Sequence, residues 1–331
     1  MGVTTEEIIN QASAWSRLGY SSADAAETMA ELSSQFAAIS PGMDVDQATD
    51  GLVSSMKAFG IEVSDAERKI SDNINRIGNT AATSNQEIVD MLTRSSAAMA
   101  TANNTIEETI ALETAAVEIT RNAETTGTAF KTLAMRIRGY DEETEELSDD
   151  LKNIAGDIAD LTKINGKGGI SLFTDETKET YKSTYQILKE ISDIWDQLSD
   201  KNQAELLEKL AGKRGGQVVA GLLTNFSAAE KAMNEMANAA GSADAEMSII
   251  QESIDFKINA LKETWVGIIQ ELIERGDIGK IVDSLTAISE AIGAITKNLG
   301  LLGTAGVGLG AVLGIKDLGR GKKFPLKVMF V

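Results

Sequence analysis

Residues that start helices recur along the first part of the chain at nearly constant intervals. Each is a Ser, Thr or Asp followed three residues later by an acid or an amide, a pairing in which side chain and backbone cap each other at a helix N-terminus. Five such pairs follow one another at nearly equal steps: Ser21 with Asp24, Asp44 with Gln47, Ser64 with Glu67, Ser84 with Glu87, and Thr105 with Glu108. Ser and Thr are abundant, so single pairs can arise by chance, but the near-constant step favours a repeat of helices.

The residues between these caps support the same interpretation. Apolar positions recur at helical spacing in two sets, Ile70, Ile74, Ile77 and Ile88, Met91, Leu92. Several caps follow a glycine suited to ending the previous helix: Gly19, Gly42, Gly60 and Gly78. Residues 1–140 are therefore predicted to form a helical repeat region of five or six helices, each of about 12–15 residues, packed as consecutive hairpins.

A helical core is predicted for residues 141–243. It opens with seven acids in the ten positions 141–150, and apolar residues then recur at Leu147, Leu151, Ile154, Ile158 and Leu161. This pattern predicts an amphipathic helix whose acidic first turn is favoured by the helix dipole. A solvated helix face explains the acids better than a cation site does.

The helical pattern breaks near residues 165–174. The segment from Asn165 to Phe173 (NGKGGISLF) contains the turn signal Asn-Gly, which predicts a short β excursion or an ordered loop. Helix is predicted to resume over 175–211 with one apolar stripe: Tyr181, Tyr185, Leu188, Ile191, Ile194, Trp195 and Leu198. In this stripe Trp195 is expected to be a core residue rather than a ligand-binding one.

The next helix is predicted to be capped by Asp200 with Gln203 and to end at Gly212. Glycine-rich stretches at 166–169 (GKGG) and 212–216 (GKRGG) invite a phosphate-binding interpretation. Both stretches lack the spacing of a phosphate-binding loop, and no strand is predicted before the first. We therefore reject the phosphate-binding interpretation for both.

Two long heptad helices are predicted within residues 244–300. Apolar residues recur at steps of three and four from Met247 to Leu272 and again from Ile278 to Leu299. Such seams are typical of coiled-coil or antiparallel hairpin packing. Gly276 is expected to end the first helix, and Asp277 to cap the second. Ile258, in the middle of the first seam, is expected to face an apolar partner.

Residues 301–331 are predicted to form a Gly-rich apolar segment and an irregular tail. No charged residue occurs over the 18 positions 298–315, which include six glycines. That length is marginal for a membrane span, although small residues suit close helix packing in lipid. Membrane contact and a flexible or buried apolar tail therefore both remain open.

Composition narrows the possible chemistry. The 331 residues include no His and no Cys, which excludes disulfides, thiolate or imidazole zinc sites, and catalytic triads that need either residue. The net charge of −19 disfavours direct binding to nucleic acid and to anionic membrane surfaces. We therefore expect no enzyme activity and no catalytic, cofactor-binding or metal-binding residue.

Three segments, taken together and in this order, resemble the core of phage tail tape measure proteins. They are RNAETTGTAFKTLAMRIRG at 121–139, YQILKEISDIWDQLSDKNQAELLEKLAGKRGGQVVAGLLTNF at 185–226, and MNEMANAAGSADAEMSIIQESIDFKINALKETW at 233–265. The resemblance extends over about residues 20–300, and proteins of that family are usually far longer. We therefore expect a fragment or a truncated member.

The resemblance implies a structural ruler and scaffold for assembly of the tail tube, with a role in genome ejection. Expected partners are the tail tube protein, tail assembly chaperones and further copies of the chain through its coiled-coil seams, together with a host membrane through 298–315. The expected location is the tail interior in the virion and the host cytoplasm during assembly.

Two other functions can be compared with the role of a structural ruler. A helical membrane-active protein, pore-forming or effector, would account for the amphipathic helices and for 298–315 but not for the three segments. A carboxylate-based hydrolase lacks any recognisable cleft motif. From sequence alone the chain is predicted to be all-α, with consecutive helical hairpins, long coiled-coil-like helices and at most a small β excursion near 165–174.

Overall fold

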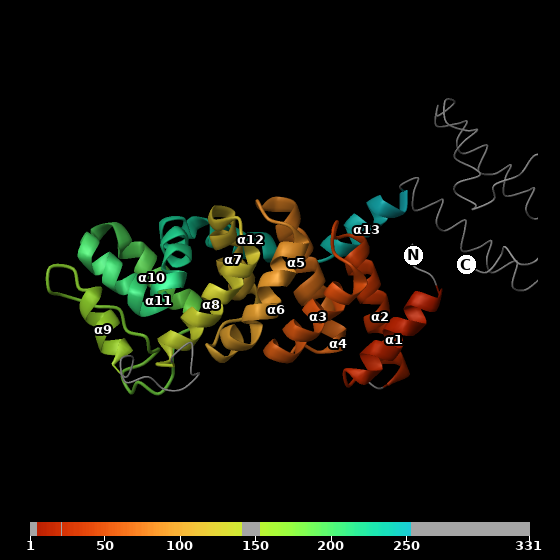
Figure 1. Cartoon of the computed structure of the whole chain (residues 1–331), viewed down its shortest axis with the longest axis horizontal. Coiled ribbons are helices and arrows are strands. Elements are labelled where there is room, and N and C mark those ends of the chain that lie inside the picture. Colours follow the sequence, from red (N-terminus) through yellow and green to blue (C-terminus); the bar gives the residue numbers. More distant parts are fainter. Residues whose placement is uncertain (1–4, 21, 141–152, 253–331) are drawn as a thin grey trace, which may run out of the picture. The chain divides into compact units, whose positions relative to one another are not determined.

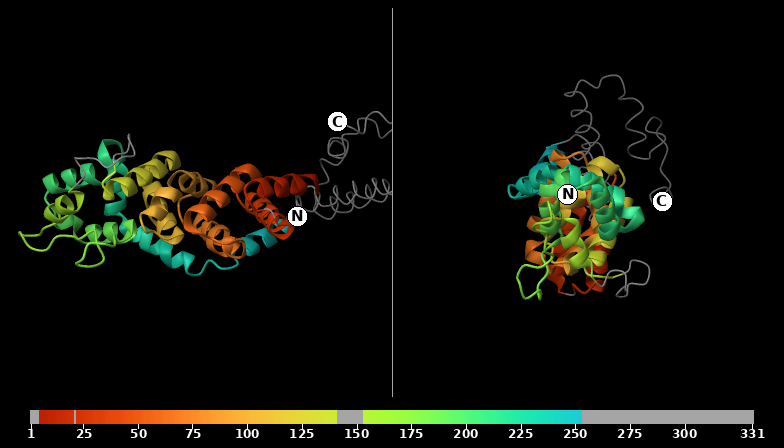
Figure 2. Two further views of the ribbon diagram at one scale, coloured as in Figure 1. Left: turned by 90° about the horizontal axis from the view of Figure 1, so that it is seen from below. Right: turned by 90° about the vertical axis from the view of Figure 1, so that its left-hand side faces the viewer.

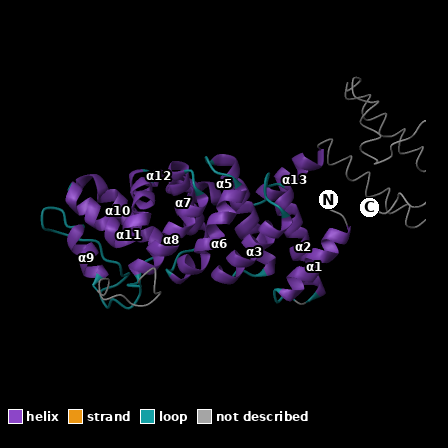
Figure 3. Cartoon of the chain, in the orientation of Figure 1, coloured by secondary structure: helices purple, strands orange, loops and turns teal. Residues whose placement is uncertain are grey.

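The computed structural model describes residues 5–20, 22–140 and 153–252, which all belong to one compact unit, Met1–Ser253. This part of the chain is all-α, as predicted, and contains no β-strand (Figure 3). Its helices are α1 (Thr5–Arg17), α2 (Ala23–Ala38), α3 (Val45–Phe59), α4 (Val63–Ala66), α5 (Asp72–Thr80), α6 (Asn85–Thr101), α7 (Ile106–Thr120), α8 (Ala123–Ile137), α9 (Ile154–Leu161), α10 (Thr184–Ile194), α11 (Asp200–Thr224), α12 (Phe226–Met236) and α13 (Ser242–Glu252). A π-helical turn, Glu67–Ser71, joins α4 to α5, and a 3-10 turn, Trp195–Gln197, follows α10.

Three of the predicted caps are complete capping boxes. Asp44, Ser84 and Thr105 each accept a hydrogen bond from a backbone N–H three residues later, at 2.8, 3.2 and 3.1 Å. In each box the acid or amide at that later position accepts a bond in return from the backbone of the cap residue. These boxes fix the starts of α3, α6 and α7.

The other two predicted caps need correction. Ser22, not its neighbour Ser21, caps α2, and Ser21 lies outside the described residues. Ser64 is not a cap, because Glu62 precedes the first helical residue and makes no side-chain capping bond. The helix that begins at Val63 then continues through the π-turn to Thr80, so Gly78 lies inside it rather than at its end.

One helix start was not predicted. Arg121 takes a left-handed conformation, with φ 52°, and ends α7. Asn122 then caps α8 by accepting a bond from the Thr125 N–H at 2.8 Å. The range 1–140 therefore contains one more interruption than the cap series indicated.

Helices that are neighbours in sequence account for only part of the packing. α1 packs on α2 and α2 on α3, as hairpins require, but the most extensive contacts also join α3 with α6, α6 with α8, α7 with α12, and α8 with α11 (Figure 1). Figure 2 shows α12 and α13 running back beside the helices near the start of the chain, where they contact α5 and, for α13, also α2. The chain thus returns over its own beginning within this unit.

The predicted apolar positions form the core. Ile70, Ile74 and Ile77 are fully buried, and so are Ile88, Met91 and Leu92. Trp15, Phe36 and Phe130 are the largest fully buried side chains. α7 is buried on nearly all sides, with small residues such as Ala111, Ala115 and Ala116 at 0% exposure. Small side chains allow several helices to approach α7 closely.

After residue 152 the elements follow one another in the predicted order, but some of them begin or end at other residues than predicted. In α9, Ile154 and Ile158 are buried as expected, while the acidic run 141–150 lies outside the described residues. α10 begins at Thr184 rather than near 175, because Ser183 caps it. Trp195 is a core residue, with 6% exposure. Tyr181 precedes the helix instead of belonging to its stripe.

The predicted β excursion is present as two isolated bridges. Ile164 pairs with Lys167, and Phe173 pairs with Tyr181. Asn165 and Gly166 between the first pair have φ of 52° and 74°, the left-handed conformations that an Asn-Gly turn requires. The loop is therefore an ordered turn structure that contains isolated β-bridges and no regular β-strand.

α11 confirms one expected feature and corrects another. Its cap is Ser199, which accepts from the Asn202 N–H at 3.2 Å, and not Asp200. Gly212 interrupts the helix as expected, with φ 62° and ψ −175°, but the helix resumes and continues to Thr224.

Of the long seams, the structure describes only the beginning. Met247, the first position of the seam 247–272, lies in α13 and is 5% exposed. Ile250, the second position of that seam, also lies in α13 and is half-buried. The part of the seam after residue 252, which includes Ile258, lies outside the described residues, as do the seam 278–299 and the apolar stretch 298–315.

Candidate functional site

The Gly-Thr-Ala segment that begins at Gly127 lies where α8 crosses α6. A methyl group on Gly127 would come within 2.9 Å of both the Cα and the carbonyl oxygen of Met91 on α6. On another side of α8, a methyl group on Gly215 of α11 would lie 3.5 Å from the Cβ of Ala129. The small residues of this segment thus bring α8 against two helices at once, which explains its composition.

Arg136, in the same segment, stabilises the interruption of α11. Its Nε donates to the carbonyl oxygen of Lys209 at 3.0 Å, and its Nη2 donates to that of Glu208, also at 3.0 Å. Carbonyl groups in the last turn before a helix break lack regular partners within the helix. Because Gly212 breaks α11 directly after these residues, the guanidinium acts as a cap supplied by another helix. Segments 121–139 and 185–226 therefore meet in one structural junction.

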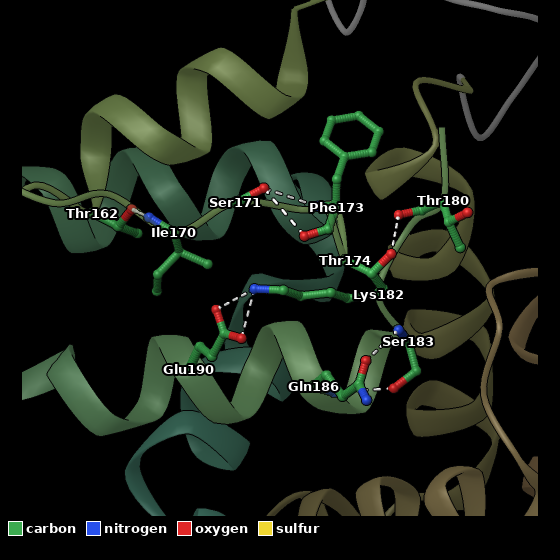
Figure 4. A network of polar contacts seen from close by, with 10 residues as sticks. All are labelled: Thr162, Ile170, Ser171, Phe173, Thr174, Thr180, Lys182, Ser183, Gln186 and Glu190. Atoms are coloured by element: carbon green, nitrogen blue, oxygen red, sulfur yellow. Dashed lines mark hydrogen bonds and ion pairs between the residues drawn. The ribbon is translucent and has the colours of Figure 1, made fainter. Parts of the chain in front are cut away.

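Side chains fix both ends of the loop 162–183 between α9 and α10. Figure 4 shows the Thr162 Oγ accepting from the Ile170 N–H at 2.7 Å, and the Lys182 Nζ bonded to both carboxylate oxygens of Glu190 at 2.6 and 2.7 Å. Ser183 closes the loop with a capping box at the start of α10. These contacts account for the ordered turn at the place where the sequence loses its helical period.

The same loop is held against α8 by a cation–π contact. The guanidinium carbon of Arg138 lies 4.2 Å from the ring centroid of Tyr181, and its Nη2 donates to the carbonyl oxygen of Lys182 at 3.3 Å. Burial lowers the pKa of Arg138 to about 10, so the side chain remains a cation at neutral pH. Lys167 of the GKGG stretch is exposed, and its backbone pairs with Ile164 in the same loop.

One carboxyl group is fully buried in the apolar core. Glu113 of α7 is 0% exposed, and neither of its carboxyl oxygens has a hydrogen-bond partner among the described residues. Burial raises its pKa to about 8, and Ser95 of α6 moderates this rise although no regular hydrogen bond joins the two side chains. The group is therefore a neutral acid in the folded chain at pH 7.

A second buried carboxyl group begins a polar stripe on α5. The polar stripe consists of Asp72, Asn75, Arg76 and Asn79, spaced at i, i+3, i+4 and i+7, so that all four lie on one face of the helix. Arg76 forms an ion pair of 2.6 Å with Glu235 of α12. Ile70, Ile74 and Ile77 occupy the opposite, core-facing side. The π-turn before Asp72 sets the rotational position of this face, and such turns often mark functional positions.

A shallow hollow lies between α9 and α11. Its volume is about 350 Å³, and its charged lining includes Asp157, Asp160, Glu205, Glu208 and Lys209. Lys209 is already paired with Asp157 at 2.7 Å. Across the described ranges, no group of three or more acids is arranged to hold a metal ion. The described features of this region are therefore contacts between helices.

The comparison with known families agrees with this structural character. Residues 1–212 match the family described as phage-related minor tail protein. The chain belongs to this family. No curated protein and no solved structure matches it. Membership gives this minor tail protein a structural role in a phage tail and a place in the virion.

The matched range of this minor tail protein covers α1 to the first half of α11, including the crossing at Gly127 and the cap from Arg136. Within the described ranges, none of its helices is both long and apolar enough to cross a membrane. The stretch 298–315 lies outside those ranges.

Two features of this minor tail protein were missed from sequence although a signal was present. The polar stripe shows the same i, i+3, i+4, i+7 spacing by which the apolar helix faces were predicted. Glu113 is the single charged residue in the run from Thr109 to Val117 (TIALETAAV), a position that favours burial of a carboxyl group. No local signal could have shown that Arg136 caps a helix that lies far along the chain.

Proposed function

We propose that this chain is a tail tape measure protein, a structural ruler and scaffold for assembly of the tail tube, and that it has no enzymatic activity. The observation that carries the proposal is a series of helices that begin about every 20 residues within a member of a phage tail family, at Ala23, Val45, Val63, Asn85, Ile106 and Ala123. A ruler needs residues that add length in nearly equal increments, and each helix with its following turn provides one.

The length of each increment follows from helix geometry. A helix rises about 1.5 Å per residue, so a unit of about 20 residues corresponds to roughly 30 Å when it lies extended along a tube. The compact packing of the isolated chain is compatible with this role, because the same helices can change partners without losing their own backbone hydrogen bonds.

The location and partners form part of the same proposal. The chain would lie in the tail interior of the virion, after assembly in the host cytoplasm with the tail tube protein and tail assembly chaperones. Its net charge of −19 would keep it from adhering to DNA that passes through the tail during ejection. Self-association through the seams 247–272 and 278–299, and contact of 298–315 with a host membrane, are further parts of the proposal.

A deletion and a matched duplication test the ruler role in the parent phage. Deleting residues 63–83 removes the helix that starts at Val63 together with its following turn, and it preserves the capping box of Ser84. Duplicating residues 85–105 adds one unit of the same length, and it preserves a box at each junction because Thr105 is again followed by Glu87 or Glu108.

Electron microscopy of the virions gives the tail length directly. We expect the deletion to shorten the tail by roughly 30 Å and the duplication to lengthen it by the same amount, each rounded to a whole ring of the tube. Misfolding of a variant predicts fewer tails but never longer ones. Tails of normal length in both variants would refute the ruler role of this region.

A further inference from the structure

The N-terminus of α13 is capped by another helix. Gly241 precedes α13 and has no side chain with which to cap it. Instead, the two carboxylate oxygens of Asp72 accept hydrogen bonds from the N–H groups of Gly241 and Ala243, at 2.8 and 2.9 Å. A carboxylate at this position also interacts favourably with the helix dipole. Asp72 is 3% exposed, so water does not compete for these bonds while α13 is in place.

The remaining contacts along α13 are also mainly polar. Asn75 donates to both the carbonyl oxygen and the Oγ of Ser242, at 3.0 and 2.8 Å. Asn79 donates to Glu246 at 3.3 Å, and Gln35 of α2 donates to Asp244 at 3.0 Å. Each hydrogen bond of this kind contributes only modest net stability, because water replaces the partner when the surfaces separate.

Apolar burial along α13 is small by comparison. Only Ala243 and Met247 are buried between positions 242 and 251, whereas Ile249 is 65% exposed. This contrasts with the crossing of α6 and α8, where apolar side chains and glycine bring the backbones together. The contact of α13 therefore depends on its polar groups to a degree that the core contacts do not.

Like charges further weaken the contact. Glu67 lies in the π-turn, and desolvation together with the nearby Asp244 and Asp72 raises its pKa. The ion pair between Arg76 and Glu235 anchors the end of α12, not α13 itself. Acidic side chains from α13, α5 and the π-turn therefore lie close together at this contact.

We propose that α13 is a detachable element, which the polar stripe of α5 holds against the helical unit and releases while the remainder of the unit stays folded. On release, Asp72, Asn75 and the first N–H groups of α13 are all hydrated, so no buried polar group of this contact is left without a partner. Release also frees Met247, which is the first position of the predicted seam 247–272. In the docked state that side chain is engaged with the helical unit, and in the released state it is available to the seam.

The absence of cysteine from the chain allows a direct test by paired labels. Glu31→Cys on α2 with Ser248→Cys on α13 reports on docking, and Thr93→Cys on α6 with Thr128→Cys on α8 reports on the core. All four positions are exposed. Spin labels attached to the full chain give a distance distribution for each pair.

In the double variant Asp72→Asn/Asn75→Ala we expect the 31–248 distribution to become longer and broad while the 93–128 distribution is unchanged. The matched control makes the same two chemical changes at exposed sites, Asp50→Asn on α3 and Asn234→Ala on α12, and should leave both distributions unchanged. A narrow, unshifted 31–248 distribution in the double variant would overturn the proposal.

A urea titration of the labelled chain with the natural Asp72 and Asn75 tests the detachment of α13 even if the double variant fails to fold. Detachment predicts that the 31–248 distribution broadens at a lower urea concentration than the 93–128 distribution. A single transition in which both pairs change together would show that α13 is an integral part of the cooperative unit, and the proposal would then be wrong.

Discussion

Glu113 and Asp72 are both buried carboxyl groups, and the regions around them differ in almost every other respect. Glu113 lies in α7 among apolar and small side chains and has no hydrogen-bond partner within the described part of the chain, so burial keeps it neutral. Asp72 lies at the border between α5 and α13, where two backbone N–H groups bind its oxygens. The first region keeps its shape through close packing, the second through directed polar bonds.

The difference predicts how each region responds to a mutation or to the entry of water. Where backbones approach as closely as at Gly127, any added atom must displace the neighbouring helix. Where contacts are polar and near the surface, water can replace them, and the elements can separate at small cost. In the proposed ruler role the helices would change partners during tail assembly, which would use both kinds of interface. The experiments below are ordered from the largest expected effect to the smallest.

The largest effect is expected from Glu113→Gln, as a change in pH dependence. The folded-state pKa of Glu113 is raised to about 8 from an ordinary value of 4.5, so between these values the folded chain binds a proton that the unfolded chain has lost. Stability contributed by this group therefore falls as pH rises through that window and levels off above it. Between pH 5 and pH 8 the free energy of unfolding of the wild-type chain should fall by roughly 4 kcal/mol relative to that of the variant.

Urea denaturation at several pH values measures this difference. Glu31→Gln, at an exposed position of α2, serves as the control and should follow the wild-type profile. Parallel profiles for wild type and Glu113→Gln would show that the carboxyl group is hydrated or paired in the folded chain.

A moderate effect is expected from Gly127→Ala. The new methyl group would meet the backbone of Met91, which cannot move without shifting α6 against α8. We expect a loss of about 1–3 kcal/mol in the free energy of unfolding, as for other overpacked cores.

Gly216→Ala is the control, because the same chemical change at this position should increase stability instead of decreasing it. Its added Cβ would lie 3.8 Å from Leu207 Cβ, an ordinary contact, and alanine favours helix over glycine. This variant should gain up to about 1 kcal/mol. If thermal denaturation shows both variants equally stabilised, the crossing at Gly127 is not as tight as described.

A smaller effect is expected from Arg136→Met, which keeps the aliphatic stem and removes the two bonds to the carbonyl groups of Glu208 and Lys209. Because the site is only partly buried, we expect a loss of about 1–2 kcal/mol. Arg214→Met, at an exposed position of α11, should have little effect on the same denaturation curve. Equal losses for the two variants would mean that Arg136 does not cap the broken helix.

The sequence predicted features that depend on residues close together in the chain. The capping boxes of Asp44, Ser84 and Thr105 are local, since a side chain and a backbone three residues apart suffice to form them. The turn at Asn165 and the interruption at Gly212 are local as well, because they depend on backbone conformations that Asn and Gly adopt readily. The all-α class followed from the sum of such signals.

Features that depend on tertiary contacts were predicted poorly. Ser64 has the same local pattern as the true caps, but the helix begins earlier, at Val63. Gly78 resembles a helix end, yet it stands inside α5 at a site where an added Cβ would lie 2.0 Å from the Oδ1 of Asn85. Asp72 acts on Gly241 and Ala243, which are too distant in the chain for any local pattern to reveal.

Native-state hydrogen exchange, followed by mass spectrometry on the full chain in low concentrations of urea, tests the central contrast most directly. The account predicts that amides of α13 exchange through a local opening that costs less free energy and depends less steeply on urea, while amides of α6 and α8 exchange only through global unfolding, which urea promotes strongly. If the amides of α13 show the same protection and the same urea dependence as those of α6 and α8, the two regions form one cooperative unit and the account is contradicted.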